Sequence, residues 1–99
     1  MIFKDKYKAI NSFIDSEGKI IQWPSKKKKK QQRLILEYLL EKVDSNVKYS
    51  EIELSNLLNE YHHFKDAALL RREMVEKSYL KRTRDCKAYW VNPVFIDEG

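Results

Sequence analysis

Cysteine, glycine and proline are scarce in this sequence, which contains one cysteine, two glycines and two prolines among its 99 residues. The single thiol, Cys86, cannot form an intrachain disulfide or supply a cysteine-based zinc site, so packing must stabilise the fold. The few glycines and prolines argue against a glycine-rich phosphate loop and against a sandwich of many tightly turned strands. We therefore expect helices to dominate.

Long apolar runs are also missing. The run at residues 67–70 is far shorter than the ~20 apolar residues that cross a bilayer, and the N-terminus lacks the apolar stretch of a secretory signal. We therefore expect a cytoplasmic protein that makes no membrane contact. Hydrophobic residues still make up 42% of the chain, which is enough for one packed domain but, at this length, not for two.

The charge is distributed in blocks. The whole chain has a net charge of +5, with +5 in residues 26–43, −3 in residues 44–64 and +4 in residues 65–84. Two basic blocks create a surface for a polyanion if folding brings them to the same side of the molecule, because neutralised phosphates release counterions. The alternative is that the lysine run, residues 26–30, is simply a solvated first turn of a helix.

The N-terminal residues predict an amphipathic helix and then an arm. A helical stripe over residues 3–14 is formed by apolar residues spaced four, three and four apart, namely Phe3, Tyr7, Ile10 and Ile14. A turn follows, and residues 19–23 favour β structure up to Pro24. This second stretch is expected to be an edge strand or an extended arm.

The clearest helix is predicted over residues 25–43, with Ser25 as its N-cap. Leu34 and Tyr38 project from the side opposite the core, and in so small a domain only the N-terminal segment or a second subunit can cover them. A homodimer through Leu34 and Tyr38 is thus one of two expectations. The core face, with Ile35 at its margin, consists of Leu36, Leu39, Leu40 and Val43.

Two more helices and a hairpin complete the chain. Ser50 and Glu53 have the spacing of a capping box, which starts a helix at residue 51. A further helix is predicted over residues 65–77. Strands at 78–83 and 88–91, joined by a turn, then form a β-hairpin.

This order of elements, with a very short strand at residues 47–49, is that of a winged helix, in which a helix-turn-helix pair precedes a β-wing. We predict an α+β fold that is mainly α: a winged helix-turn-helix with an added N-terminal helix and extended arm. Residues 1–24 form the helix and arm, and residues 25–99 form the winged-helix domain.

The stretch from residue 15 to residue 92 resembles the bacterial domain of unknown function number 2087. The resemblance rests on residues 15–18, 24–26, 48–51, 70–75 and 89–90. It implies a winged-helix-like fold and a regulatory context, since members stand alone or follow a helix-turn-helix regulator, but it implies no reaction. The family usually has glycine, as a helix C-cap, where this chain has Ser78.

In winged-helix proteins that bind DNA, the second helix of the helix-turn-helix enters the major groove. In this chain that helix is the one predicted at 65–77. Its outward face has a net charge of −1, which suits phosphates poorly, and consists of Lys65, Asp66, Leu69, Arg72, Glu73 and Glu76. Basic side chains in the lysine run and on the wing are better placed to contact DNA. They would bind its phosphates without specifying its sequence. The candidate nucleic-acid contacts are Lys26, Lys27, Lys28, Lys29, Lys30, Arg33, Lys65, Arg72, Lys81, Arg82, Arg84 and Lys87.

Four other side chains favour structural roles. Arg71 falls within the apolar arc of its helix, where its guanidinium can clamp Glu51 or Glu53. The adjacent His62 and His63 point in different directions on a helix and favour a turn or core role over metal binding. Cys86 is expected to be an incidental thiol of the wing tip, although its basic neighbours would suit a redox sensor. No cofactor, metal site, small-molecule substrate or enzyme activity is expected.

We therefore expect a DNA-associated transcriptional regulator that binds double-stranded DNA. The alternative is a protein-interaction or dimerisation module on the same scaffold, which uses Leu34, Tyr38 and Leu69 and does not bind DNA. RNA binding in place of DNA binding, the target sequence and any effector stay open at this stage.

Overall fold

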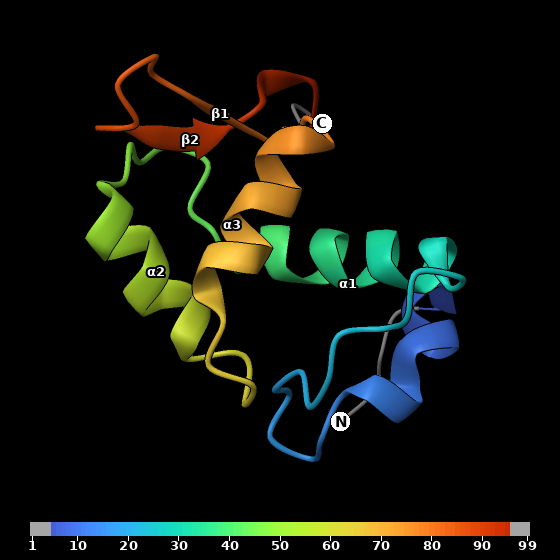
Figure 1. The fold of residues 1–99 in the computed structure, drawn as a ribbon. Coiled ribbons are helices and arrows are strands. Elements are labelled where there is room, and N and C mark those ends of the chain that lie inside the picture. The colour runs from blue at the N-terminus through green and yellow to red at the C-terminus, as the bar shows by residue number, and fades with distance from the viewer. Residues whose placement is uncertain (1–4, 96–99) are drawn as a thin grey trace.

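A computed structural model describes residues 5–95 of the chain. The helices and strands are, in order, the 3-10 helix η1 (Asp5–Phe13), α1 (Lys29–Leu40), α2 (Glu51–Asn59), α3 (Ala67–Glu76), β1 (Leu80–Arg82), β2 (Tyr89–Val91) and the 3-10 helix η2 (Pro93–Phe95). The two strands pair antiparallel, with Leu80 opposite Val91. The predicted α+β class with mainly helical content is confirmed. Figure 1 shows α3 crossing α1, with η1 at one end of the molecule and the hairpin at the other.

One hydrophobic core joins these elements. α1 packs against both η1 and α3, while α3 also packs against α2 and β1. Fully buried side chains come from every layer, and include Ile10, Ile35, Leu36, Leu39, Leu54, Leu58, Leu70 and Met74. Ile35, expected at the margin of its helix face, lies within the core because α1 is covered on more than one side. Among the described residues, no helix is long and apolar enough to cross a membrane.

The N-terminal helix covers the second face of α1. Tyr7 and Tyr38 meet edge to face with ring centroids 5.5 Å apart, and the Tyr38 hydroxyl donates to the Gly18 carbonyl oxygen at 2.7 Å. The Tyr7 hydroxyl donates to the Glu41 carboxylate, and burial together with this carboxylate raises the pKa of Tyr7. For Tyr38, the N-terminal segment is therefore the correct one of the two predicted covers.

Tyr38 is not available for the predicted homodimer contact through Leu34 and Tyr38, because its own chain covers it. Tyr38 is 5% exposed, and Leu34 is partly buried against the core of its own chain. The stripe predicted for the first helix is confirmed at Tyr7 and Ile10, which are buried within η1; Ile14 is also buried but follows η1, where it forms a bridge with Ile20. Phe3, the fourth member of that stripe, lies outside the described residues.

The prediction of Ser25 as N-cap was wrong. α1 begins at Lys29, and its N-cap residue, Lys28, makes no capping side-chain hydrogen bond. The preceding residues form a turn closed by the Lys28 amide on the Ser25 carbonyl at 2.9 Å. The buried Gln32 side chain donates to the carbonyls of Pro24 and Ser25 at 2.9 and 3.1 Å. These hydrogen bonds hold the arm against α1, so the regular helix begins only at Lys29.

The capping box is confirmed. The Ser50 hydroxyl accepts from the Glu53 amide at 3.1 Å, and the Glu53 carboxylate accepts from the Ser50 amide at 2.9 Å. Just before it, Tyr49 forms an antiparallel bridge with Tyr89 of β2. This bridge is all that forms of the strand predicted at residues 47–49. Residues 19–23 likewise form an arm rather than a full strand, with bridges at Ile20 only.

The end of α3 is a Schellman motif. The Tyr79 amide donates to the Met74 carbonyl at 2.9 Å and the Ser78 amide to the Val75 carbonyl at 3.0 Å. Ser78 therefore has a left-handed backbone, with φ of 65°. A side chain with a Cβ is strained in this conformation, whereas glycine adopts it freely.

We expect Ser78→Gly to stabilise the protein by about 0.5–1 kcal/mol, because relief of this strain exceeds the added entropy of the unfolded chain. Thermal unfolding should show a midpoint raised by about 2–8 °C. Ser12→Gly is the matched control, since Ser12 is exposed within η1 and is not among the positive-φ residues; this change should lower the midpoint. A lowered midpoint for Ser78→Gly would contradict the strain assigned to this position.

Candidate nucleic-acid interface

Helix α3 lies between two open grooves. One, which we name the arm groove, separates it from the start of α1 and is lined by Trp23, Pro24, Ser25, Lys26, Lys29, Gln32, Leu69, Glu73 and Lys77. The other, the hairpin groove, separates it from the β-hairpin and is lined by Ala68, Arg71, Arg72, Val75, Glu76, Arg82, Cys86 and Tyr89. Each groove therefore borders one of the two basic segments predicted from the sequence.

The lysine run projects from the start of α1. All five side chains are exposed, and the Lys28 ammonium lies 5.4 Å from the centre of the Phe13 ring. α1 has no acidic residue in its first turn, so the positive end of the helix dipole opposes these lysines. The run is therefore not placed to stabilise its helix, which leaves its charge available to an anion.

The hairpin turn fixes the second basic segment. The Thr83 hydroxyl donates to the Asp85 carboxylate at 2.7 Å and accepts from the Lys87 amide at 3.0 Å. The hydrogen bond from Thr83, together with one from the Lys87 amide to the Asp85 carboxylate at 3.1 Å, lowers the pKa of Asp85. One guanidinium nitrogen of Arg82 donates to the Thr83 and Arg84 carbonyls at 3.1 and 3.3 Å, so the charge of Arg82 is held over the turn. Lys81, Arg82, Arg84 and Lys87, which we name the basic hairpin, are all exposed.

The outer face of α3 carries both signs of charge. Asp66 caps the helix by accepting from the Leu69 amide at 3.0 Å, and Glu73 pairs with Lys77 at 3.0 Å. Arg72 and Lys65 are exposed, but Lys65 precedes the helix in a left-handed conformation, with φ of 53°. The pairing of Glu73 weakens the negative character that was predicted for this face.

Arg71 is the internal clamp that was predicted. Its guanidinium lies 2.8 Å from the Glu51 carboxylate and donates to the Ser55 hydroxyl at 2.8 Å, with only 17% of its side chain exposed. It also lies 5.8 Å from the centre of the Tyr89 ring. Arg71 therefore joins α2, α3 and β2 and is already engaged within the chain.

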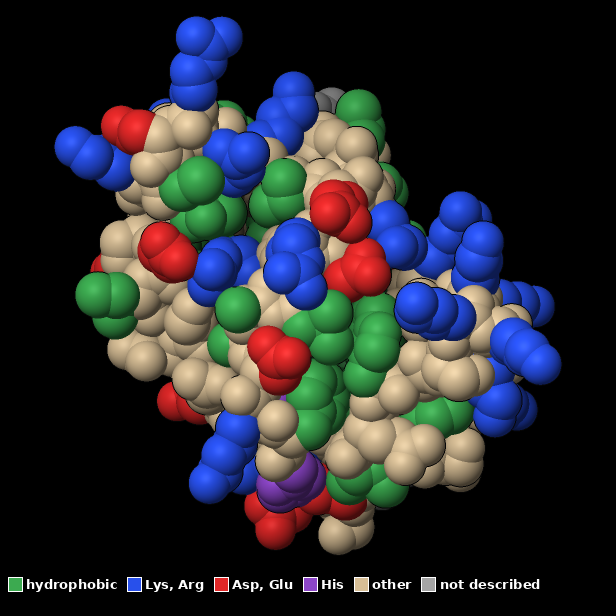
Figure 2. Space-filling model, viewed as in Figure 1, with side chains coloured by type: hydrophobic (Ala, Val, Ile, Leu, Met, Phe, Trp, Pro, Cys, Tyr) green, Lys and Arg blue, Asp and Glu red, His purple; other side chains and the backbone are tan. Residues whose placement is uncertain are grey.

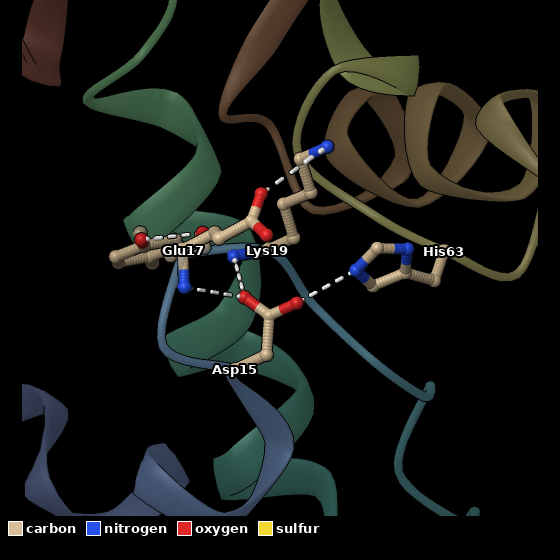
Figure 3. Close-up of polar contacts among 6 residues, drawn as sticks. Asp15, Glu17, Lys19 and His63 are labelled. Atoms are coloured by element: carbon tan, nitrogen blue, oxygen red, sulfur yellow. Dashed lines mark hydrogen bonds and ion pairs between the residues drawn. The ribbon is translucent and has the colours of Figure 1, made fainter.

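The arm is anchored by Asp15 (Figure 3). One carboxylate oxygen accepts from the amides of Glu17 and Lys19, each at 2.9 Å. The other lies 2.7 Å from His63 Nε2, which comes from the segment between α2 and α3. These contacts, chiefly the Lys19 amide, lower the pKa of Asp15. The same anchor aligns the arm that carries Trp23 and the lysine run.

The lowered pKa of Asp15 makes the anchor sensitive to acid. A carboxyl whose pKa is lower in the folded state stabilises the fold above its unfolded pKa, about 3.9, and loses this contribution as the pH falls through the folded value. Urea unfolding between pH 7 and pH 3 should thus show a weaker pH dependence for Asp15→Asn than for the unaltered chain. Asp85→Asn removes a separate hydrogen-bonded carboxyl, so the two effects should add. Identical acid dependence of Asp15→Asn and the unaltered chain would refute this role.

His62 has the core role that was predicted, through hydrogen bonds that the sequence did not reveal. It is 5% exposed; its Nδ1 lies 2.7 Å from the Leu58 carbonyl, and its Nε2 accepts from the Asp66 amide at 2.9 Å. Leu58 and Asp66 are each four residues away, a spacing that could have suggested these partners. Among residues 5–95 no group of three potential metal ligands occurs.

The predicted contacts come together only in part. The lysine run and the basic hairpin do not form one continuous patch, because α3 and its two grooves lie between them. Figure 2 shows Lys and Arg side chains gathered at the start of α1 and again over the hairpin, with both signs of charge between. The two segments are nevertheless visible from the same side of the molecule. Cys86, expected to be an incidental thiol of the wing tip, is partly buried and lines the hairpin groove.

A family model described as "Uncharacterized protein conserved in bacteria (DUF2087)" matches residues 19–91. The match includes the lysine run, α1, α2, α3 and both strands, and it begins after η1. No curated protein and no solved structure matches the chain.

Proposed function

Because the chain belongs to DUF2087, a bacterial family described only as uncharacterised, we propose a function from the geometry of this chain itself. The protein is a winged-helix regulator that binds double-stranded DNA, mainly through phosphate contacts from the lysine run and the basic hairpin. Arg33, Lys65 and Arg72 supplement these contacts.

The connectivity supports the winged-helix assignment. α2 and α3 form a packed helix pair that is followed by the β1–β2 hairpin, as a helix-turn-helix is followed by its wing. The bridge between Tyr49 and Tyr89 places the segment before α2 beside β2. The sheet thus gains a third strand position on the side of β2 away from β1.

The observation that carries the DNA proposal is the position of α3 between two basic segments. The arm groove contains Lys26 and Lys29, whereas the hairpin groove contains Arg72 and Arg82. A helix that enters the major groove has a phosphate backbone on either side, so positive charge is useful on both flanks. This arrangement suits DNA better than a single basic patch would.

Fluorescence anisotropy with a labelled duplex tests this function. If about five phosphates are neutralised, log K should fall with log salt with a slope of about −4 to −5. Duplexes of unrelated sequence should bind with similar slopes, because phosphate contacts do not read bases. Absence of binding at low salt would reject the proposal.

One observation favours protein binding as a second candidate. Leu69 and Trp23 are only partly buried and line the same groove. A concentration-dependent dimer in sedimentation experiments, together with no affinity for DNA, would favour this interaction module over the regulator.

A further inference from the structure

The arm groove has an apolar floor that contact with DNA phosphates would not use. Its volume is about 660 Å³, within the range of pockets for small organic ligands. The apolar surface of the floor comes from Trp23 in the arm and Leu69 in α3, which are both partly exposed. Figure 2 shows hydrophobic side chains as a strip between α3 and the arm.

The walls of the groove are held in place before any ligand arrives. The Gln32 amide ties the arm to α1 through the carbonyls of Pro24 and Ser25. Pro24 is almost completely buried, and Trp23 packs against the core. On the far side, the ion pair with Glu73 at 3.0 Å positions the Lys77 ammonium. A groove ordered in this way loses little conformational entropy when it binds.

The charges around the groove favour an anion. Three ammonium groups line it, those of Lys26, Lys29 and Lys77, against the single carboxylate of Glu73. Glu73 already pairs with Lys77, so Lys26 and Lys29 supply the excess positive charge. A ligand that suits both floor and rim has an apolar body and one anionic group.

We propose that the arm groove is a binding site for small organic anions of this kind, of which an aromatic carboxylate is the simplest example. The ring packs on Trp23 and Leu69, while the carboxylate accepts hydrogen bonds from the ammonium groups of Lys26 and Lys29. Since these lysines also belong to the proposed DNA contacts, ligand and DNA compete for them. The competition rests on the proposed function, whereas ligand binding does not.

Naphthoate is a suitable probe, and Trp23 is a reporter within the site. The chain has two tryptophans, so Trp90→Phe leaves Trp23 as the only one. Naphthoate should alter its fluorescence saturably with a Kd of about 1 mM, given the usual affinity per atom of small ligands. Naphthylmethylammonium, which has the same ring and the opposite charge, and acetate, which lacks the ring, should bind at least about tenfold more weakly.

Paired variants locate the site. Leu69→Gln should weaken naphthoate binding about fivefold or more, whereas Ile52→Gln, on an α2 side chain that is 73% exposed and outside the groove, should not change it. Lys26→Gln with Lys29→Gln should weaken it similarly, whereas Lys81→Gln should not. If the Trp90→Phe chain fails to fold, amide NMR shifts of the unaltered chain at these positions replace the fluorescence readout.

The outcomes for the groove and for DNA are separable. Equal binding of all three probes, binding unaffected by Leu69→Gln, or no binding of naphthoate at 10 times the expected Kd of about 1 mM would overturn the anion site, whatever happens with DNA. Binding of an acidic peptide without binding of naphthoate would also overturn it, in favour of a protein partner. If naphthoate binds but the duplex does not, the anion site stands and the regulator proposal fails.

Discussion

Replacing Lys26, Lys27 and Lys30 with glutamine should lower the affinity for duplex DNA about 100- to 1,000-fold at 50 mM salt, because each phosphate contact contributes about tenfold under this condition. The slope of log K against log salt should become less negative by about 2–3 at the same time. Lys28 is left unchanged because it contacts the Phe13 ring. Fluorescence anisotropy at several salt concentrations gives both quantities.

Loss of folding does not explain such a result. The three side chains are exposed, and Lys30 lies in the first turn of α1, where the helix dipole disfavours positive charge. Removal of the Lys30 charge should stabilise α1 by about 0.3 kcal/mol or more. Thermal unfolding of the triple variant should therefore match or exceed that of the unaltered chain.

A second triple variant controls for net charge. The control replaces Lys19, Lys42 and Lys48 with glutamine, which changes the charge by the same amount outside the lysine run and the basic hairpin. Because Lys42 and Lys48 lie 4.9 Å and 5.2 Å from the centres of the Tyr38 and Trp90 rings, thermal unfolding of this variant is measured alongside its affinity. We expect this variant to retain most of the DNA affinity. Equal losses for the two triple variants would mean that overall charge alone attracts DNA, and the assigned interface would then be wrong.

The largest effect on stability is expected at His62, where replacement with alanine should cost about 2–4 kcal/mol. The change leaves the Asp66 amide without its ring acceptor and removes the ring hydrogen bond to the Leu58 carbonyl, which keeps only the Tyr61 amide at 3.0 Å. It also removes the contact with the Phe64 ring, whose centroid is 4.5 Å away. The unfolding midpoint should fall by about 8 °C or more, as measured by thermal denaturation.

His63→Ala is the matched control for His62→Ala. His63 is the adjacent residue and the same side-chain type, but its side chain is 49% exposed and its hydrogen bond with Asp15 lies at the surface. Exposed pairs contribute about 0–1 kcal/mol, so His63→Ala should lower the midpoint far less than His62→Ala. Comparable losses, or a larger loss for His63→Ala, would contradict the buried role of His62.

The candidate site could be predicted in part from local patterns. The charge blocks of the sequence located both basic segments. The apolar arc of α3 identified Arg71 as a clamp, but only the structure shows that its partner is Glu51 rather than Glu53. The arm groove was not predicted. Trp23 and Leu69 are 46 positions apart in the chain, and no sequence period relates an arm to a helix that packs beside it.

The amino-acid sequence by itself determined the elements whose causes are local: the capping box at Ser50, the stripe of η1 and the hairpin. The spacing of neighbouring residues is sufficient for these, because their hydrogen bonds and apolar faces span only a few positions. Only the tertiary structure decided that η1 covers Tyr38, that Gln32 delays the start of α1, and that α3 separates the two basic segments. These outcomes depend on which surfaces pack together, and packing joins residues that are far apart in the chain.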